Sequence, residues 1–564
     1  MTVSTSEDSR RVAPERRRAR NGGWPLAAIV ALAVGLRVLA WHNAVQMTND
    51  GVDFLWQAER LLEGDVHGAL SHPYHPLYAM LTALLALATG DVLVAAVAVS
   101  IVAGVAIVLG VHALARLALP NRPDVAWGAA LLAALHERTL ILTSDVASDG
   151  LFLGLFLLSL ALVLEAEQRR QFKLRMLLSG LLAGLAYLAR PEALFLVGVA
   201  LLWVLLGVAR RTGRRGRPLP RPPIYLAGLG AFLAGLVVIA APYVWAMHAI
   251  SGGWGLSLKP SMAAAQLSGA PTWAPPPDAP IAGPGIGPRE IDDELVETPR
   301  RRPSPAGAAP PAQGTAAARA DGATSSADSA RRTHEVLVAT RDGLVHSAVE
   351  LVRAIRLDVV VLALLGLPLF LRRRSGLVAV AATLMVGWVC LGTTQWVLSG
   401  YLARRHMLAP ALLALPLAGA GLAWLWGAWR RPGLRRLGGR ILVVLVLVAA
   451  GASGARTRHT NHLPRVQALH WAAEHTAPDQ RIGVHRRKDG HDAQRDIFLV
   501  DLPCPEAQLL EALERWNVGL LVLDLDRVAR HAPHWLDGAL FVERERFGTG
   551  KDTVIVFERG SAGS

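Results

Sequence analysis

The segment richest in possible chemistry is the polar stretch at residues 42–91, after the first long apolar segment. It reads NDGVDFLWQAERLLEG over residues 49–64 and SHPYHPLY over residues 71–78, so acidic, aromatic and histidine side chains are crowded together. Residues 52–62 have the apolar spacing of an amphipathic helix, which places Asp50 just before a helix on a membrane surface. The carboxylate either caps this helix or belongs to a site, and its position where a span emerges favours the site.

Further polar residues lie where other apolar segments end. Residues 143–150 read TSDVASDG, residues 190–192 read RPE, and residues 400–406 read GYLARRH. Simple structural interpretations exist, because Ser148 or Asp149 is an ordinary helix cap and an arginine beside a membrane can extend its side chain to the interface. The arginines of the last two segments nevertheless break the charge bias of the chain. Together with the acidic loop, they predict a site that combines anionic and cationic groups.

Membrane-spanning helices must position these segments. Of the 564 residues, 52% are hydrophobic, and the mean hydropathy is +0.35, which is more than a soluble chain needs for its core. The sequence therefore predicts an all-α polytopic membrane bundle. About eleven apolar segments of roughly 15 to 27 residues reach spanning length: 24–41, 92–118, 125–143, 150–165, 176–190, 192–209, 224–248, 357–371, 376–398, 406–428 and 440–455.

The basic residues predict how these spans are oriented. The formal net charge is +14, but the arginines are concentrated in short runs between apolar segments, which indicates topology signals and no nucleic-acid partner. All runs fall on the cytoplasmic side if residues 76–88 do not cross, and about 13 residues are too few to do so. A multi-pass protein of the inner or plasma membrane is expected, with residues 1–23 as a basic cytoplasmic tail. Its C-terminus is expected to be extracytoplasmic.

Composition divides the chain into further parts. Residues 24–455 form the expected membrane domain. Within it, residues 271–332 are dominated by Pro, Ala, Gly and Ser, which predicts a disordered outer loop. Residues 456–564 are expected to form a small extracytoplasmic α/β domain, since strand-like and helical patterns alternate there. The strands are expected at 481–484, 497–501, 518–525 and 553–557, and the helices at 464–476 and 506–516.

The cysteines offer little chemistry. Only Cys390, within an apolar segment, and Cys504, far along the chain, occur. They build neither a disulfide framework nor a thiolate metal site. The acidic residues give no clear metal site either, because no spacing of carboxylates decides for a metal. Asp50 and Asp149 could nevertheless share a divalent cation.

The polar segments resemble those of family 39 glycosyltransferases, the protein O-mannosyltransferase and aminoarabinose transferase group with the GT-C fold. Residues 50–64 resemble that group's D-x-x-x-[YF]-L-x-x-A-x-x-L-x-x-G loop, and residues 75–78 its H-P-P-L-Y segment. Residues 184–192, GLAYLARPE, resemble its G-L-A-x-L-T-[RK]-P-E stretch, and residues 405–408, RHML, its R-[YH]-L-L element. These elements occur in the family's order and extend over most of the membrane part.

The resemblance implies transfer of a sugar from a polyprenyl monophosphate to a hydroxyl of a glycan, lipid or protein acceptor, with inversion. Asp50 would be the base, and Arg190 and Arg405 would stabilise the departing phosphate. The candidates for substrate binding are Asp53, His75, Tyr78, Asp149, Arg190, Glu192, Arg404 and Arg405. Many family members have Asp-Glu where this chain has Asp50-Gly51, so Asp53 is the candidate for a second carboxylate.

Two other functions are compatible with a polytopic chain. A transporter or flippase of lipid-linked or small polar substrates is the alternative, since ionisable residues near spans also mark transport routes. Ionisable residues in the middle of spans and a repeat between the halves would favour it, and the sequence shows little of either. A noncatalytic scaffold for the C-terminal domain would need far fewer spans.

Overall fold

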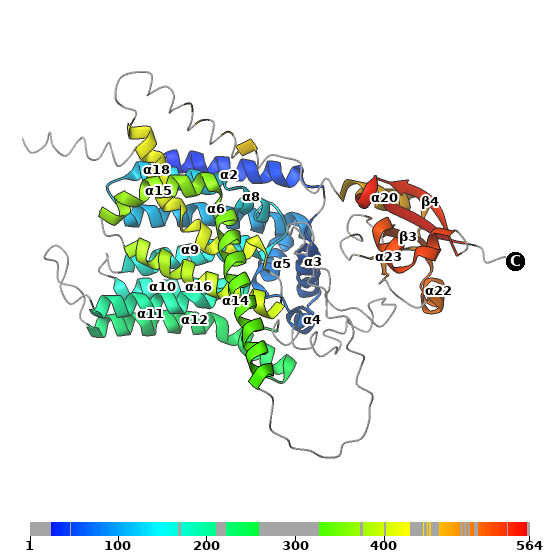
Figure 1. Cartoon of the computed structure of the whole chain (residues 1–564), viewed down its shortest axis with the longest axis horizontal. Coiled ribbons are helices and arrows are strands. Elements are labelled where there is room, and N and C mark those ends of the chain that lie inside the picture. Colours follow the sequence, from blue (N-terminus) through cyan, green and yellow to red (C-terminus); the bar gives the residue numbers. More distant parts are fainter. Residues whose placement is uncertain are drawn as a thin grey trace, which may run out of the picture.

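The structure is a computed structural model, in which a bundle of apolar helices carries a small α/β domain at one end (Figure 1). It describes residues 24–45, 47–166, 171–209, 222–258, 326–372, 376–399, 402–428, 462–485, 497–500, 506–537 and 540–560, with residues 441, 444, 448, 451–452, 489 and 493 between them. The all-α membrane bundle and the C-terminal α/β fold predicted from the sequence are confirmed. The expected tail at residues 1–23 lies outside the described residues.

The bundle contains most of the expected spans. Within the described ranges, six helices are long and apolar enough to cross a membrane, and up to eight spans result if two bent helix pairs each count as one. The six are α2 (Trp24–His42), α6 (Val92–Ala118), α9 (Ser148–Ala166), α10 (Phe172–Ala189), α12 (Pro222–Ser251) and α16 (Gly376–Ser399). Three apolar helices are shorter: α5 (Leu77–Thr89), α7 (Pro123–Leu135) and α11 (Phe195–Ala209). The expected span at 440–455 lies largely outside the described residues.

One expected span, at 125–143, is interrupted in the structure. The chain divides there into α7 and the short helix α8 (Glu137–Leu142), because His136 adopts an extended conformation. The Nδ1 atom of His136 accepts a hydrogen bond from the backbone of Thr139, and its Nε2 lies 3.0 Å from the carbonyl oxygen of Ala354. The imidazole thus accepts a hydrogen bond from a backbone N–H group that the break leaves without a partner inside the helix. This bond lowers the free-energy cost of interrupting a helix within an apolar bundle.

The expected span at 406–428 is also divided. It consists of η3 (Arg404–Met407), α17 (Leu408–Leu412) and α18 (Leu415–Ala428), with a bend of 58° between the second and the last. Pro410 lies within α17 and Pro416 in the first turn of α18. Proline lacks the N–H that a continuous helix uses, so the bend falls where the ladder of hydrogen bonds is already weakened. The bend places η3 beside the polar segments described below.

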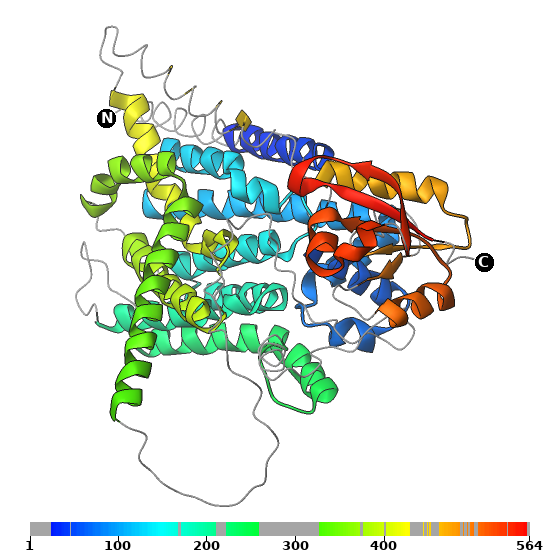
Figure 2. The ribbon, with the colours of Figure 1, turned by 45° about the vertical axis from the view of Figure 1, so that its right-hand side comes forward.

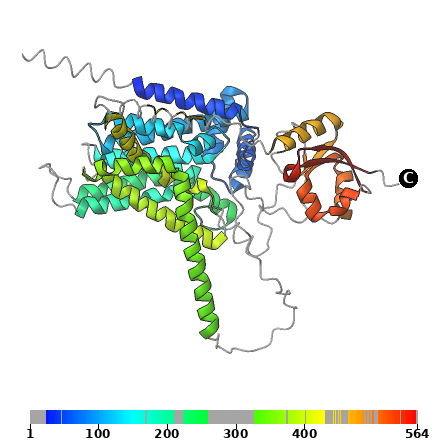
Figure 3. The same cartoon turned by 45° about the horizontal axis from the view of Figure 1, so that its top comes forward.

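Two long helices, α14 (Ser326–Ile355) and α15 (Leu357–Arg372), meet at an angle of 85°. Arg356 forms the corner with a φ of 75°, an uncommon conformation for a residue with a side chain, and its Nε lies 3.1 Å from Oδ1 of Asp358. Helix α15 packs along the spans, whereas α14 runs across them and projects from the bundle (Figure 3). Because α14 begins at Ser326, the end of the predicted disordered loop is helical. Residues 271–325 lie outside the described part.

The two faces of α14 differ in polarity, with polar residues buried and apolar residues exposed. Ser347 and Glu350 are buried against the bundle, whereas Leu344, Val345 and Val352 are exposed. A helix that turns polar residues inward and leucine and valine outward suits hydrocarbon rather than water. The part of α14 next to the bundle therefore fits a position in the membrane interface.

Close contact between spans depends on small residues. Helices α10 and α12 pack along each other, and a Cβ atom at Gly180 would overlap the carbonyl oxygen of Phe232. Helices α15 and α18 meet in the same way, since a Cβ at Gly421 would overlap the carbonyl oxygen of Leu362. Spans surrounded by lipid gain stability from such close backbone approach rather than from exclusion of water.

Helix α3 (Asn49–Leu62) forms a platform at one end of the bundle. It runs across the direction of the spans, followed by the short α4 (Val66–Ser71) (Figure 1). Phe54, Leu55 and Ala58 are buried, as the amphipathic spacing predicts, and Leu62 at the end of the helix is exposed. The C-terminal domain lies over this same end of the bundle (Figure 2).

The C-terminal domain contains a five-stranded sheet in the order β2-β1-β3-β5-β4. Its strands are β1 (Arg481–Val484), β2 (Ile497–Leu499), β3 (Val518–Asp524), β4 (Phe541–Phe547) and β5 (Val554–Arg559), and its principal helices are α20 (Leu463–His475) and α22 (Glu506–Arg515). Strand β1 is parallel to β2 and β3, whereas β5 is antiparallel to β3 and β4. The four predicted strands and both helices are present. Strand β4, FVERERF, was not predicted, because it is largely exposed and its charges hide the alternation of a strand.

A buried ionic network joins α20 to the sheet. Arg465 donates through Nε to Asp489, at 2.8 Å, and through Nη1 to Asp524 at the end of β3. His485 follows β1, and its Nε2 lies 3.0 Å from Oδ2 of Asp524. The guanidinium therefore connects one helix with the ends of two parallel strands.

Candidate active site

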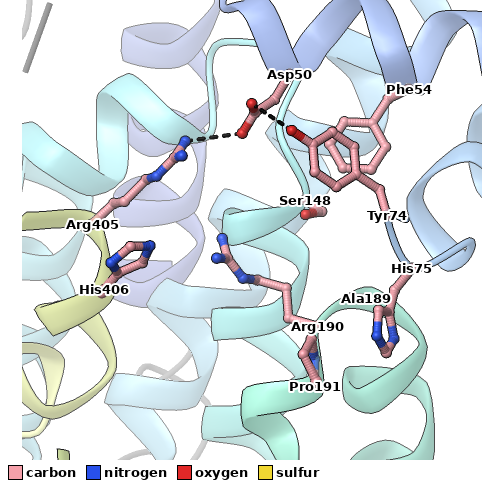
Figure 4. Close-up of a pocket in the computed structure, with 10 residues that line it drawn as sticks. All are labelled: Asp50, Phe54, Tyr74, His75, Ser148, Ala189, Arg190, Pro191, Arg405 and His406. Carbon is pink, nitrogen blue, oxygen red and sulfur yellow. Dashed lines mark hydrogen bonds and ion pairs between the residues drawn. The ribbon is translucent and has the colours of Figure 1, made fainter. Parts of the chain in front are cut away.

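A cavity lies among the polar segments that the sequence singles out. Residues from five parts of the chain line it: Asp50, Phe54, Tyr74, His75, Ser148, Ala189, Arg190, Pro191, Arg405 and His406. The space between these residues, including the part open to solvent, is about 450 Å³. Figure 4 shows Asp50 and Arg405 facing each other across this space, with Arg190 below them. All four polar segments that the sequence singles out therefore contribute to this one cavity.

Asp50 is held by two side chains. Its Oδ1 accepts a hydrogen bond from the hydroxyl of Tyr74 at 2.9 Å, and its Oδ2 lies 3.0 Å from Nη1 of Arg405. The sequence predicts Asp50 just before the helix, but the structure places it in the first turn of α3, with Thr48 as the N-cap residue. The alternative that Asn49 or Asp50 caps α3 is therefore wrong.

Arg190 forms the second charged centre. It lies in the turn between α10 and η1 (Pro191–Leu194), where its guanidinium pairs with Asp149 in the first turn of α9. Its Nη2 also lies 3.3 Å from Oε1 of Glu192. Burial opposes the charge, but the carboxylates of Asp149 and Glu192 outweigh it and raise the pKa of Arg190. The guanidinium is therefore a permanent cation.

A smaller adjoining cavity links the two charged centres. Asp149 and Glu192 line it together with Arg190, Arg405 and His406, and the last three line the main cavity as well. Both arginines can therefore reach one ligand that extends from one cavity to the other. Arg190 and Arg405 therefore lie beside the acidic residue Asp50 of the loop after α2.

Three predicted candidates line neither of the two cavities. The hydroxyl of Tyr78 is fully buried, 2.7 Å from both the carbonyl oxygen of Ala96 and Oγ of Ser100. Asp53 lies 3.6 Å from Nε2 of His72, and Nε of Arg404 lies 3.2 Å from Oε2 of Glu350 on α14. These contacts hold helices and loops together, so the three residues support the site from outside it.

His75 does line the cavity, beside an aromatic cluster. Its Nδ1 lies 2.6 Å from the carbonyl oxygen of Tyr187, near the end of α10. Its ring centre lies 5.1 Å from that of Tyr187 and 5.2 Å from that of Tyr243 in α12. The histidine therefore ties the loop after α4 to two spans.

Tyr74 is the functional residue that sequence reasoning missed. It lies within the SHPYHPLY segment, but no spacing indicates that its hydroxyl reaches Asp50, 24 residues earlier. Burial, together with the charges of Asp50 and Asp53, raises the pKa of Tyr74 well above its usual value. The hydroxyl therefore stays protonated and acts as a donor to Asp50. Ser148 and His406 are further lining residues that were not predicted as candidates.

The arrangement suits proton removal beside a bound anion. Asp50 can accept a proton, and Arg190 and Arg405 can bind an anion such as a phosphate by charge-assisted hydrogen bonds. In the part of the chain that the structure describes, no group of three or more His, Cys, Asp or Glu residues is arranged to hold a metal ion. Asp50 and Asp149 each face an arginine instead.

Comparison with known proteins agrees with this chemistry. Residues 71–259 match the family model of dolichyl-phosphate-mannose-protein mannosyltransferases. This range contains His75, Asp149 and Arg190 but neither Asp50 nor Arg405. A search of the curated proteins found no match to the chain.

The two ArnT structures show the same fold. The structure of ArnT from Cupriavidus metallidurans in the apo state has 12% sequence identity and a TM-score of 0.54, and the match covers 95% of this chain and 97% of that chain. ArnT bound to undecaprenyl phosphate has 13% identity and a TM-score of 0.51, with 96% and 99% covered. The Archaeoglobus fulgidus oligosaccharyltransferase has 13% identity, a TM-score of 0.47, and 95% and 73% covered.

The family match and the fold support each other. The matched residues include all helices from α5 to α12, and the likeness to ArnT extends over nearly the whole chain. The chain is a multi-pass membrane glycosyltransferase with the GT-C fold, and its residues 71–259 are similar to the dolichyl-phosphate-mannose-protein mannosyltransferases.

Proposed function

We propose that this glycosyltransferase moves a sugar from a polyprenyl-monophosphate donor to a hydroxyl of an acceptor on the extracytoplasmic side of the membrane. The contact between Asp50 and Arg405, at 3.0 Å in a cavity that Arg190 also lines, carries this proposal. It places a base beside two cations, which are the groups that such a transfer needs.

The step is a single displacement. The acceptor oxygen attacks the anomeric carbon while Asp50 takes its proton, and the bond from that carbon to the phosphate oxygen breaks. The prenyl monophosphate leaves with the electron pair of that bond, and the configuration at the anomeric carbon inverts. Because phosphate leaves without protonation at neutral pH, one carboxylate suffices where a glycosidase needs two.

Arg405 and Arg190 hold the leaving group. Both line the two adjoining cavities, so a phosphate between them can accept hydrogen bonds from both guanidinium groups. Such donors stabilise charge that develops on the departing oxygen. Arg405 also holds Asp50, so binding of the phosphate and orientation of the base involve the same side chain.

The depth of the cavity favours a lipid-linked donor. Arg190 follows the end of α10 and η3 precedes α17, so both arginines lie at the ends of apolar helices, which favours a position at the depth of lipid headgroups. A prenyl chain can then remain in hydrocarbon while its phosphate reaches the arginines. Undecaprenyl phosphate bound to ArnT, a protein of the same fold, supports this assignment.

The distribution of charge favours an outward cavity. Arg175, near the start of α10, lies at the opposite end of this 18-residue helix from Arg190. Likewise Arg116 lies near the end of α6, whereas Ala96, near its start, contacts Tyr78 beside the loop of the cavity. Basic residues that flank spans favour the cytoplasm, which puts the cavity on the other side. The acceptor class, whether glycan, lipid or protein, stays open.

Replacing the base tests the proposal. Asp50→Asn keeps the shape of the side chain but removes its basicity, so transfer from a prenyl-phosphate sugar should fall by about 10²-fold or more. Donor binding, measured by competition with a fluorescent prenyl phosphate, should persist. Glu59→Gln makes the same chemical change on an exposed position of α3 and serves as the control. Near-normal turnover of the Asp50→Asn protein would eliminate Asp50 as the base.

A further inference from the structure

A buried arginine outside the cavity has no place in the mechanism above. Arg37 lies in α2, five residues before the helix ends, and its side chain is fully buried. Its Nε donates to Oγ1 of Thr143 at 2.7 Å, and its Nη1 donates to the carbonyl oxygen of Ala33 at 2.9 Å. Among the described residues, Nη2 has no hydrogen-bond partner and no carboxylate pairs with the guanidinium. A Cβ at Gly104 would overlap this guanidinium, so α6 leaves room for it.

Burial of the Arg37 guanidinium costs free energy. A charged side chain within a membrane bundle carries a desolvation penalty of several kcal/mol, and a carboxylate partner usually offsets part of it. Arg37 has only neutral acceptors, and one of its nitrogens makes no bond among the described residues. Leucine or methionine at this position would serve packing alone. The guanidinium therefore points to a role that needs its directed donors.

Thr143, the acceptor of Arg37, begins the turn that leads into α9. Its Oγ1 also donates to the carbonyl oxygen of Thr139, which fixes the hydroxyl between two partners. Its methyl group lies against Gly150, where a Cβ would overlap it. Gly150 follows Asp149, the partner of Arg190. The position of Thr143 thus sets the position of the first turn of α9.

The same turn also holds the start of α3. The backbone N–H of Thr48 donates to Oδ1 of Asp145 at 3.4 Å, and Oγ1 of Thr48 donates to the carbonyl oxygen of Val146 at 3.2 Å. A Cβ at Gly51 would lie 3.1 Å from Cβ of Val146. Asp50 lies between Thr48 and Gly51, so its backbone rests on this turn.

We propose that Arg37 is a positioning residue, which fixes the turn at residues 143–148 and so sets the geometry between Asp50 on α3 and Asp149 on α9. This rests on the proposed function for its kinetic consequence but not for its structural one. A catalytic group displaced by about 1 Å loses about 10² in rate. Loss of Arg37 therefore lowers kcat rather than weakening donor binding.

The test compares three variants with the wild type in liposomes. Arg37→Gln removes the forked donor, and Thr143→Val removes its acceptor while keeping the methyl that lies against Gly150. Both should lower kcat for prenyl-phosphate-sugar transfer by about 10²-fold with little change in the donor KM. Combining them should cost little more than either alone, since they break one contact. Arg175→Gln, which breaks the half-buried pair with Glu165 near the start of α10, should lower the thermal unfolding midpoint without this loss of kcat.

A second readout needs no activity. Spin labels at position 59 on α3 and position 102 on α6, both exposed, report the position of α3 relative to the bundle in a chain whose two cysteines are replaced. Arg37→Gln and Thr143→Val should shift or broaden this distance distribution, and Arg175→Gln should not. If the wild type transfers no sugar, the proposed function is wrong, and the labels alone decide the role of Arg37. Wild-type distances in both variants, or a wild-type kcat in Thr143→Val, would overturn the proposal.

Discussion

Asp50 is fixed by one neighbour on each carboxylate oxygen. Tyr74 donates to Oδ1 from the loop after α4, and Arg405 reaches Oδ2 from η3, 355 residues along the chain. Two elements that lie far apart in the sequence therefore orient the carboxylate. A preorganised base of this kind needs little rearrangement when the acceptor hydroxyl arrives.

Replacing Arg405 should show whether its guanidinium binds the donor. Arg405→Ala should raise the donor KM by about ten- to hundredfold, the usual worth of a charge-assisted hydrogen bond. Arg405→Lys keeps the charge but loses the planar fork, so its effect should be smaller and in the same direction. Steady-state transfer with varied prenyl-phosphate sugar measures both.

Arg404→Lys is the matched control for these variants. The neighbouring arginine pairs with Glu350 and does not line the main cavity, so its donor KM should stay near that of the wild type. An Arg405→Ala protein with an unchanged donor KM would mean that Arg405 serves only to orient Asp50.

Sequence reasoning found the charged residues of the cavity but not their partners. Asp50, Arg190 and Arg405 could be predicted because each stands at the end of an apolar segment. Tyr74 could not, since only the fold brings its hydroxyl to Asp50. Tyr78 was expected to bind substrate because it belongs to the same short segment, yet its hydroxyl bonds to α6.

At the scale of elements, hydropathy predicted where apolar helices lie and failed where they bend. Residues 125–143 look like one span, because the apolar residues on both sides outweigh His136, Glu137 and Arg138. The break at His136 depends on the carbonyl oxygen of Ala354, which is more than two hundred residues away. Strand β4 was missed for a different reason, since an edge strand with charges on both faces has no apolar alternation to detect.

Glycines that allow spans to touch should be sensitive to added volume. A Cβ at Gly235 of α12 would overlap the carbonyl oxygen of Leu177 on α10, whereas nothing lies within 4 Å of a Cβ at Gly230 of the same helix. Gly235→Val should therefore destabilise the protein by about 1–3 kcal/mol through overpacking. Gly230→Val should be nearly neutral. Thermal unfolding of the purified variants in detergent measures the difference, and equal midpoints would contradict the packing described here.

In the whole molecule, helix α3 and the C-terminal domain lie at the same end of the bundle (Figures 1 and 2), and Asp50 of α3 lines the cavity. Helices α3 and α4 lie between this domain and the spans. An acceptor that approaches Asp50 from this end therefore meets the C-terminal domain on the same side of the membrane.

Labelling from one side of the membrane can test the orientation. Single cysteines at positions 60 and 530 should react with a membrane-impermeant maleimide in intact cells, because positive charges keep the opposite end of the bundle in the cytoplasm. A cysteine at position 215, within a basic run, should react only after the membrane is permeabilised. The reverse pattern would place the cavity in the cytoplasm.

The central claim is that a phosphate on a lipid carries the sugar to this cavity. The most direct measurement offers the purified protein in liposomes two donors with the same sugar, one a prenyl monophosphate and the other a nucleotide, with a mixed glycan, lipid and peptide acceptor pool. Transfer is expected from the prenyl monophosphate alone and should be lost in Asp50→Asn. Transfer from the nucleotide sugar alone would rule out a lipid-linked donor, because a nucleotide sugar would not reach the cavity from the cytoplasm if it opens on the outer face as proposed.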